Sequence, residues 1–231
     1  MKPKFLVSGT GPHCGKTMAG CAIAFALRVR AMRVGVMKPI AVGCTPDDAR
    51  LPGAHDSDDA NSLLAAAGAD LPLEIVSLYR YRAALGPLQA AVADGAPPPD
   101  FAAISRALGT IERSSDAVIV EEACGVDDAC GLAARIDAEH DFADLAIAQR
   151  LEVILVVASR PGFVAAAGRS LAYARERGLT IRGAILNALD PDASATVAHD
   201  AARLAATTNV RILGTVRYKE PLSLAIIEQL L

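Results

Sequence analysis

Short apolar runs recur along the chain, and segments of helical composition separate them. The run 153–157 reads VILVV, which is continuous rather than alternating and is therefore typical of a strand covered by helices on both faces. Six such runs predict strands at residues 5–7, 34–37, 117–120, 153–157, 181–186 and 212–216. Strands that alternate with helices indicate a mostly parallel sheet, so the expected fold class is α/β, with helices on both faces of the sheet.

Alanine-rich segments lie between the predicted strands, and alanine has the highest helix propensity of any residue. These segments predict helices at residues 16–29, 57–67, 101–112, 165–177 and 195–206. Gly178 follows three charged residues and is expected to end the fourth helix. The proline run 97–99 breaks the helical pattern, and we interpret it as a stiff connection within one domain over residues 1–231.

The composition is that of a soluble globular protein, with 52% hydrophobic and 21% charged residues. The formal net charge is -3, and no basic stripe or basic amphipathic helix is visible, which argues against nucleic-acid and membrane partners. Only 4% of the residues are aromatic and none is tryptophan, so bases would find little surface on which to stack. The sequence shows no apolar leader or spanning segment, and we expect a cytoplasmic protein.

The cysteines are odd in number and include no C-x-x-C pair. This pattern favours reduced thiols in a cytosolic protein over a disulfide framework. Cys124 and Cys130 could be combined with His140 as metal ligands, but the spacing matches no common zinc pattern, so we expect no zinc site. The five cysteines are Cys14, Cys21, Cys44, Cys124 and Cys130.

The segment 7–17 carries the strongest functional signal. It reads VSGTGPHCGKT directly after an apolar run, which indicates a strand, a phosphate-binding loop and the start of a helix. In such a loop, backbone amides and the helix N-terminus bind phosphate, a lysine reaches the outer phosphates and a hydroxyl ligates Mg2+. The strict pattern has glycine where this chain has Thr10, so an ordinary turn before a helix is the alternative. The predicted nucleotide-binding residues are Thr10, Gly11, Pro12, His13, Cys14, Gly15, Lys16, Thr17 and Met18.

Further candidates follow the predicted strands, because ligands of an open parallel sheet bind beyond the carboxyl ends of its strands. Lys38 follows the second strand and is either a phosphate ligand or a solvated surface charge. Asp58 and Asp59 begin a helix, where they either favour its dipole or supply a carboxylate to Mg2+. Glu121 ends a buried strand, and Asn187 either pairs with a purine edge or forms a turn.

At these residues the chain resembles the dethiobiotin synthetase family over nearly its whole length. The shared elements are the Ser-Gly-Thr loop that ends in Gly-Lys-Thr, the Lys-Pro strand end, the Asp-Ala helix start, the Val-Glu strand end and an Asn followed by Pro191. The resemblance implies a P-loop NTPase-like fold. It also implies Mg2+ ligands at Thr17, Asp59 and Glu121, with Asp58 as a competitor if the alignment shifts by one residue. Phosphate- and carbamate-contacting lysines would be Lys16 and Lys38, and the adenine-reading residue would be Asn187.

The same resemblance implies the reaction and its partners. The family is ATP- and Mg2+-dependent and closes a cyclic urea on a vicinal diamine, 7,8-diaminononanoate, with CO2 or bicarbonate as the carbon source. Lys16 and Lys38 would be the catalytic residues, and a homodimer is expected. By position, the substrate would meet Val42, Gly43, Ala123, Cys124 and Gly125.

Several positions depart from the family pattern, mostly in the substrate half. Val42 replaces a serine, Glu122 and Cys124 replace glycines, and Pro12 with His13 changes the phosphate loop. A lysine-to-asparagine segment that helps to hold the substrate's acid tail is here 160–166, which ends at Ala165 and Ala166. Because lost polar contacts can change discrimination strongly, two other functions stay open. One is an ATP-dependent ligase or amidating enzyme with another substrate, and the other is a non-catalytic nucleotide-binding partner subunit.

Overall fold

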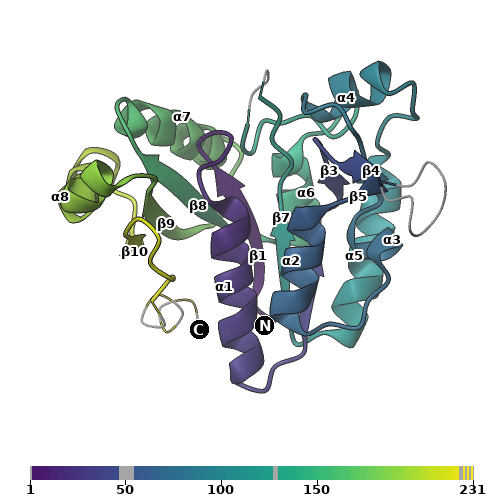
Figure 1. Ribbon diagram of the computed structural model, residues 1–231, viewed down its shortest axis with the longest axis horizontal. Coiled ribbons are helices and arrows are strands. Elements are labelled where there is room, and N and C mark those ends of the chain that lie inside the picture. Colours follow the sequence, from purple (N-terminus) through teal and green to yellow (C-terminus); the bar gives the residue numbers. More distant parts are fainter. Residues whose placement is uncertain are drawn as a thin grey trace.

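A six-stranded sheet runs through the middle of the molecule, with helices on both of its faces (Figure 1). The computed structural model describes residues 2–46, 55–126, 130–223, 226, 228 and 230. The strand order is β10-β9-β8-β1-β7-β2, and every pair of neighbours is parallel. This arrangement confirms the expected α/β class and all six predicted strands. Their bounds are β1 (Lys4–Gly9), β2 (Val34–Met37), β7 (Ala117–Glu121), β8 (Glu152–Ser159), β9 (Ile181–Ala188) and β10 (Ile212–Val216).

All five predicted helices are also present, with small shifts at their ends. They are α1 (Lys16–Val29), α2 (Asp58–Ala67), α5 (Phe101–Ser114), α7 (Phe163–Glu176) and α8 (Pro191–Thr208). Helix α7 begins two residues before the predicted start, directly after Gly162, whose φ of 84° ends the preceding turn. Three shorter helices escaped the prediction because they offer at most about two turns of periodicity. These are α3 (Leu73–Val76), α4 (Pro87–Ala93) and α6 (Phe142–Gln149).

Two small sheets fold the segment after β2 back toward the rim of the main sheet. Strand β3 (Ile40–Ala41) pairs in parallel with β6 (Tyr79–Arg80), and β4 (Thr45–Pro46) pairs antiparallel with β5 (His55–Asp56). Two further backbone hydrogen bonds, from Gly43 N–H to the Ala83 carbonyl and from Cys44 N–H to the Tyr81 carbonyl, hold the chain between them. Residues 42–45 are thereby fixed beside the carboxyl ends of the central strands.

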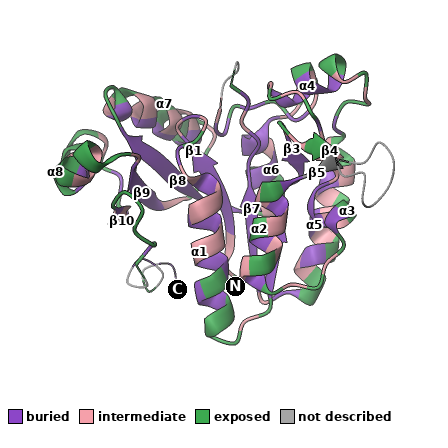
Figure 2. Cartoon of the chain, viewed as in Figure 1, coloured by how far each residue is buried: buried purple, intermediate pink, exposed green. Residues whose placement is uncertain are grey.

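The central strands are buried on both faces, as their continuous apolar sequences predicted (Figure 2). Successive residues of β1 point to opposite sides: Phe5 and Val7 join the core that includes α1 and α2, whereas Leu6 joins the core that includes α5 and α6. A third apolar cluster lies between the sheet and helices α7 and α8. The rigid centre of the molecule is therefore the set of strands whose ends carry the candidate residues.

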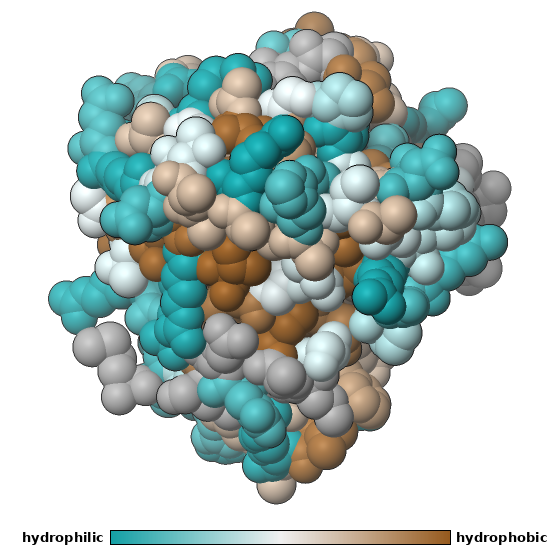
Figure 3. All heavy atoms as spheres, turned by 90° about the vertical axis from the view of Figure 1, so that its left-hand side faces the viewer, coloured by the Kyte–Doolittle hydropathy of each residue, from teal (hydrophilic) through white to brown (hydrophobic). Residues whose placement is uncertain are grey.

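Large apolar side chains reach the surface at scattered positions on several elements rather than on one. They are Phe25, Val29, Val92, Val126, Ile147 and Tyr218. Figure 3 views the molecule from the side of α8 and β10, where hydrophilic side chains surround smaller areas of apolar surface. Within the described ranges, no helix is both long enough and apolar enough to cross a membrane.

Ile119 tests the contribution of the central strands. Its side chain is fully buried in β7, between β1 and β2. We expect Ile119→Ala to lower the free energy of unfolding by about 2–5 kcal/mol, because the substitution removes buried apolar contacts and leaves a cavity. Urea unfolding followed by circular dichroism measures this loss. Val92→Ala, at a side chain 82% exposed, is the control and should have little effect; an equal loss in both variants would contradict the packing described here.

Candidate functional site

The phosphate-loop motif lies between β1 and α1, at the carboxyl edge of the sheet. Gly15 adopts a φ of 99°, and a Cβ at this position would overlap the side-chain amide of Asn187, so both conformation and space require glycine. His13 is also left-handed, with a φ of 54°. The first turn of α1 contains no acidic residue of its own, and the positive end of the helix dipole faces the loop.

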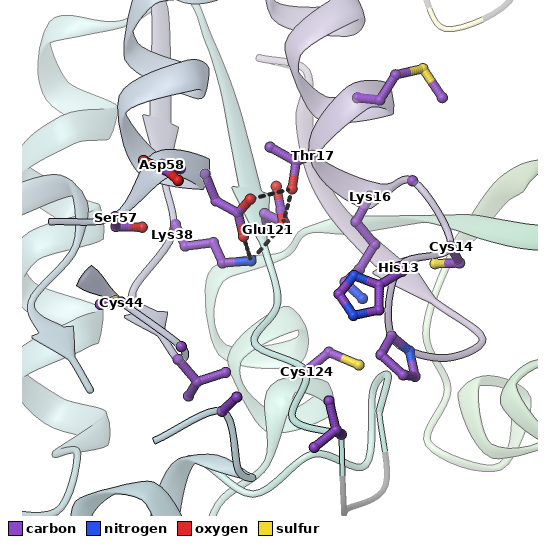
Figure 4. A pocket seen from close by; sticks show the side chains of 18 of the residues that line it. His13, Cys14, Lys16, Thr17, Lys38, Cys44, Ser57, Asp58, Glu121 and Cys124 are labelled. Atoms are coloured by element: carbon purple, nitrogen blue, oxygen red, sulfur yellow. Dashed lines mark hydrogen bonds and ion pairs between the residues drawn. The ribbon is translucent and has the colours of Figure 1, made fainter. Parts of the chain in front are cut away.

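A cavity of about 570 Å³ opens beside this loop (Figure 4). Its wall brings together the loop, the end of β2, the start of α2 and the end of β7, which are distant in sequence. The predicted residues that line it are Pro12, His13, Cys14, Gly15, Lys16, Thr17, Met18, Lys38, Val42, Gly43, Asp58, Asp59, Glu121 and Cys124. Sequence reasoning missed the lining residues Cys44, Thr45, Ser57, Ala84 and Val126, most of which lie on short connections without a motif.

Four polar side chains converge at the floor of the cavity. The Thr17 hydroxyl lies 3.0 Å from Asp59 Oδ1 and 2.9 Å from Glu121 Oε1. Lys38 Nζ lies 2.9 Å from Asp59 Oδ2 and 2.5 Å from Glu121 Oε1. Figure 4 shows Thr17, Lys38 and Glu121 pointing toward one another. Four segments therefore place two carboxylates, one hydroxyl and one ammonium within direct contact: the start of α1, the residue after β2, the start of α2 and the end of β7.

Lys38 and Asp59 each shift the pKa of the other toward its charged form. Burial alone would lower the pKa of Lys38, but the neighbouring carboxylates of Glu121 and Asp59 outweigh that effect and hold this pKa above its ordinary value. Burial would likewise raise the pKa of Asp59, yet the Lys38 ammonium keeps it below its usual value. These contacts therefore favour the protonated, positively charged form of Lys38 in the cavity.

Asp59, rather than Asp58, makes the contacts with Thr17 and Lys38. Ser57 caps α2 by accepting a hydrogen bond from the Ala60 amide, which sets the first turn of the helix. Asp59 then faces the cluster, while Asp58 lines the same cavity with an exposed side chain. Of the two aspartates that the sequence left open, the geometry favours Asp59 as a metal ligand.

Thr17, Asp59 and Glu121 offer the oxygen ligands that Mg2+ prefers. Glu121 Oε2 is buried and has no hydrogen-bond partner within the described ranges, so one carboxylate oxygen is available for a further cation contact. No group of three or more His, Cys, Asp or Glu side chains suited to a metal occurs in the part of the chain that the structure describes. Two carboxylates and one hydroxyl suit Mg2+, which usually keeps several waters and binds phosphate oxygens besides one or two carboxylates.

Lys16 does not join this cluster and instead contacts the Gly11 carbonyl and Glu122. Its ammonium donates a hydrogen bond of 3.2 Å to the Gly11 carbonyl and lies 3.9 Å from Glu122 Oε1. The same Glu122 oxygen accepts the Gly9 amide at 2.9 Å. Burial raises the pKa of Glu122 to about 7, although the neighbouring Lys16 opposes the rise. Glu122 is fully buried beneath the loop. The sequence did not predict its contacts with Gly9 and Lys16.

Asn187 supports the phosphate loop from β9. Its amide group donates a hydrogen bond of 3.0 Å to the Cys14 carbonyl, and the side chain is buried. The residue does not line the cavity described above, and neither do Thr10, Gly11, Ala123 and Gly125. Its predicted role in reading adenine stays a prediction, and support of the loop is an additional role.

The predicted substrate positions divide into two groups. Val42, Gly43 and Cys124 line the cavity, whereas Ala123 is buried and Gly125 packs so closely on the Leu85–Gly86 backbone that a Cβ would not fit. The expectation of reduced thiols is wrong for one pair, because Cys124 and Cys130 form a disulfide in the structure. The turn brings their Cα atoms to 4.8 Å, a separation that sequence spacing does not reveal. Cys14, Cys21 and Cys44 are free.

The segment 160–166 lies at a second, more open cavity of about 430 Å³, which Arg160 and Phe163 line. Arg160 also reaches the phosphate loop, because a Cβ at Gly11 would lie 2.8 Å from its Nη2 atom. The segment therefore borders the loop but does not line the first cavity.

The fold and the loop define a P-loop nucleotide-binding protein of the α/β class. A family model described as "AAA domain" matches residues 3–225. The sequence is 34% identical over 189 residues to "ATP-dependent dethiobiotin synthetase BioD" of Xanthomonas campestris pv. campestris (strain 8004), covering 82% of this chain and 80% of that protein. The Xylella fastidiosa (strain Temecula1 / ATCC 700964) protein of the same name is 33% identical, covering 81% and 78%. The chain therefore belongs to the dethiobiotin synthetase family.

Solved structures confirm the fold. The "MinD cell division protein, Aquifex aeolicus" superposes with a TM-score of 0.57 at 14% identity, covering 99% of this chain and 95% of that one. A chain of the "MinC:MinD cell division protein complex, Aquifex aeolicus" gives a TM-score of 0.58, also at 14% identity, covering 99% of this chain and 94% of that one. At this identity the likeness concerns the fold alone.

The Asn187 contact predicts a measurable effect on stability in the absence of nucleotide. Asn187→Ala removes the hydrogen bond to the buried Cys14 carbonyl and should lower the free energy of unfolding by about 1 kcal/mol. Asn187→Asp has nearly the same size but places an acceptor against that carbonyl, so its loss should be larger. Urea unfolding ranks the variants, and an unchanged midpoint in both would contradict the supporting role.

Proposed function

We propose that this chain is an ATP- and Mg2+-dependent ligase of the dethiobiotin synthetase kind, which closes a cyclic urea on 7,8-diaminononanoate with CO2. The main support is the meeting, in one cavity, of a phosphate loop with the cluster of Thr17, Lys38, Asp59 and Glu121. The names of the curated relatives point to the same reaction.

The phosphate loop would bind the outer phosphates of ATP. The amides of the loop and the N-terminus of α1 lie at the cavity wall, and Lys16 extends along the same wall. In this proposal Lys16 neutralises charge on the outer phosphates, as the lysine of a phosphate loop does. Asn187 holds the loop from behind and, as the sequence predicts, reads adenine.

Thr17, Asp59 and Glu121 would hold Mg2+, which supplies positive charge to the phosphate oxygens. Lys38, whose pKa the neighbouring Glu121 and Asp59 carboxylates hold above its ordinary value, would add a second positive charge beside them. The substrate supplies its own nucleophile: its amine takes up CO2 as a carbamate, the carbamate is phosphorylated, and the second amine closes the ring with loss of phosphate. The chain's contribution is then orientation and charge neutralisation, for which no side-chain base is needed.

The predicted substrate positions that line the cavity also favour a second candidate function. Val42 lines the cavity with an apolar side chain, and Cys124 contributes a disulfide sulfur. Neither offers the strong hydrogen bond that a carbamate oxygen would accept, so an ATP-dependent ligase or amidating enzyme that uses a different amine or acid is the alternative. A non-catalytic nucleotide-binding partner subunit would bind ATP without turnover.

Several other expectations stay predictions. They are the organisation of residues 1–231 as one domain, the homodimer, the cytoplasmic location, and the absence of nucleic-acid and membrane partners. The family assignment supports a small-molecule substrate but does not identify it.

Phosphate release tests the proposed reaction directly. With ATP and Mg2+ present, we expect release only when both 7,8-diaminononanoate and bicarbonate are added. Lys16→Ala should abolish ATP binding and phosphate release, because it removes the lysine that reaches the outer phosphates. Calorimetry provides the binding control. ATP binding without diamine-dependent release would favour the alternative functions, and unchanged ATP affinity in Lys16→Ala would remove the phosphate-loop assignment.

Glu121→Gln tests the proposed Mg2+ site. The substitution keeps the size of the side chain but removes a charge from the ligand set, so Mg2+-dependent nucleotide binding should weaken by about tenfold or more. Calorimetric titrations of ATP with Mg2+ and with EDTA separate the metal-dependent part. A thermal melt checks that the variant folds. If only the melting temperature changed, while the gain in affinity from Mg2+ stayed the same, Glu121 would be a structural carboxylate.

A further inference from the structure

We propose that Glu122 is a positioning residue that sets nucleotide affinity through Lys16. The carboxylate holds the empty phosphate loop in its binding shape, and its negative charge offsets part of the positive charge that Lys16 offers to phosphate. This inference rests on the proposed ATP-binding function. It concerns a residue that has no role in the reaction described above.

Glu122 joins two parts of the loop that are seven residues apart. Its Oε1 atom accepts the Gly9 amide at 2.9 Å and lies 3.9 Å from Lys16 Nζ. Its own backbone amide donates to the Val7 carbonyl at 3.3 Å, which continues the pairing of β7 with β1. The stem of Lys16 crosses Gly9 so closely that a Cβ there would lie 3.0 Å from it. The Glu122 side chain is therefore placed by the sheet itself, directly beneath the loop.

Glu122 lies on the side of Lys16 that faces away from the cavity. Lys16 lines the cavity, whereas Glu122 does not, and the Glu122 side chain is fully buried. A phosphate in the cavity would therefore meet the Lys16 ammonium, with Glu122 behind it. Glu122 would therefore not touch a nucleotide bound in the cavity. It can affect binding only by changing the position or charge of Lys16, by changing the loop backbone, or by electrostatic repulsion over a distance.

The fixed charges near the loop make this effect a strong one. Two ammonium groups, of Lys16 and Lys38, face three carboxylates, of Asp59, Glu121 and Glu122. These five groups are net negative with Glu122 and neutral without it, and Arg160 adds a positive charge beside Gly11. Because a buried charge is screened far less than an exposed one, its repulsion of an incoming triphosphate is substantial.

Glu122→Gln separates the charge from the shape. A glutamine oxygen can still accept the Gly9 amide, and Lys16 keeps its hydrogen bond to the Gly11 carbonyl, so the loop retains its supports. The negative charge is lost, and an amide NH2 takes the place of Oε2, which is buried and has no hydrogen-bond partner in the described part of the chain. We expect the dissociation constant for ATP to fall by about tenfold, with a smaller gain for ADP and none for AMP, which lacks the outer phosphates that Lys16 reaches. A merely structural residue would weaken all three nucleotides or leave them unchanged.

The experiment is a calorimetric titration of the full chain with ATP, ADP and AMP at pH 8. Glu122→Asp keeps the charge and is expected to gain no affinity, while Glu139→Gln removes one charge at an exposed site and serves as the matched control. Circular dichroism and a thermal melt verify folding. If the glutamine variant does not fold, Glu122→Met provides a neutral side chain of similar length.

The outcomes distinguish this inference from the proposed function. Tighter ATP binding by Glu122→Gln, graded from ATP to AMP and absent in Glu139→Gln, supports it. Equal or weaker ATP binding by the neutral variant, with normal binding by the native chain, overturns the inference alone. Failure of both the native chain and the neutral variant to bind ATP overturns the inference together with the proposed function.

Discussion

The site depends on the parallel alignment of β1, β7 and β2, which brings opposite charges to one edge of the sheet. Lys38 follows β2, Glu121 ends β7, and the phosphate loop follows β1. Burying any of these charges alone would be costly, whereas paired charges compensate one another. The ion pair of 2.5 Å between Lys38 and Glu121 is therefore the contact that allows a charged site at the end of an apolar sheet.

That pairing also prepares the site for anionic and cationic ligands together. Without a metal, Lys38 supplies the positive charge between Asp59 and Glu121. The proposed metal ion would add a second positive charge there. On the other side of the loop, Lys16 lies 3.9 Å from Glu122 and donates its hydrogen bond to the Gly11 carbonyl. A carboxylate near each lysine restricts the lysine side chain before any ligand binds. The side chain therefore loses little conformational entropy when phosphate binds.

The sequence predicted the sheet and the loop well because both leave local signals. Continuous apolar runs identify buried strands, and the Gly-Lys-Thr motif locates the loop. Residues brought together only by strand register were beyond such reasoning: the Gly9 amide and Glu122 are 113 positions apart and meet because β1 pairs with β7. The Cys124–Cys130 disulfide and the short helix α6 were missed for similar reasons, since a turn geometry and two helical turns give weak patterns.

The two halves of the cavity differ in what they demand of a ligand. The phosphate half consists of charged groups fixed by the central strands, and its chemistry follows from the fold. The other half consists of Val42, Gly43 and Cys124 on connections that short strands and a disulfide hold in place. Connections can change their side chains without disturbing the sheet. Nucleotide binding and substrate choice are thus separable in this fold, because Val42 and Cys124 stand on such connections, whereas the lysines and carboxylates of the site are held by the sheet and the helices that begin at its carboxyl edge.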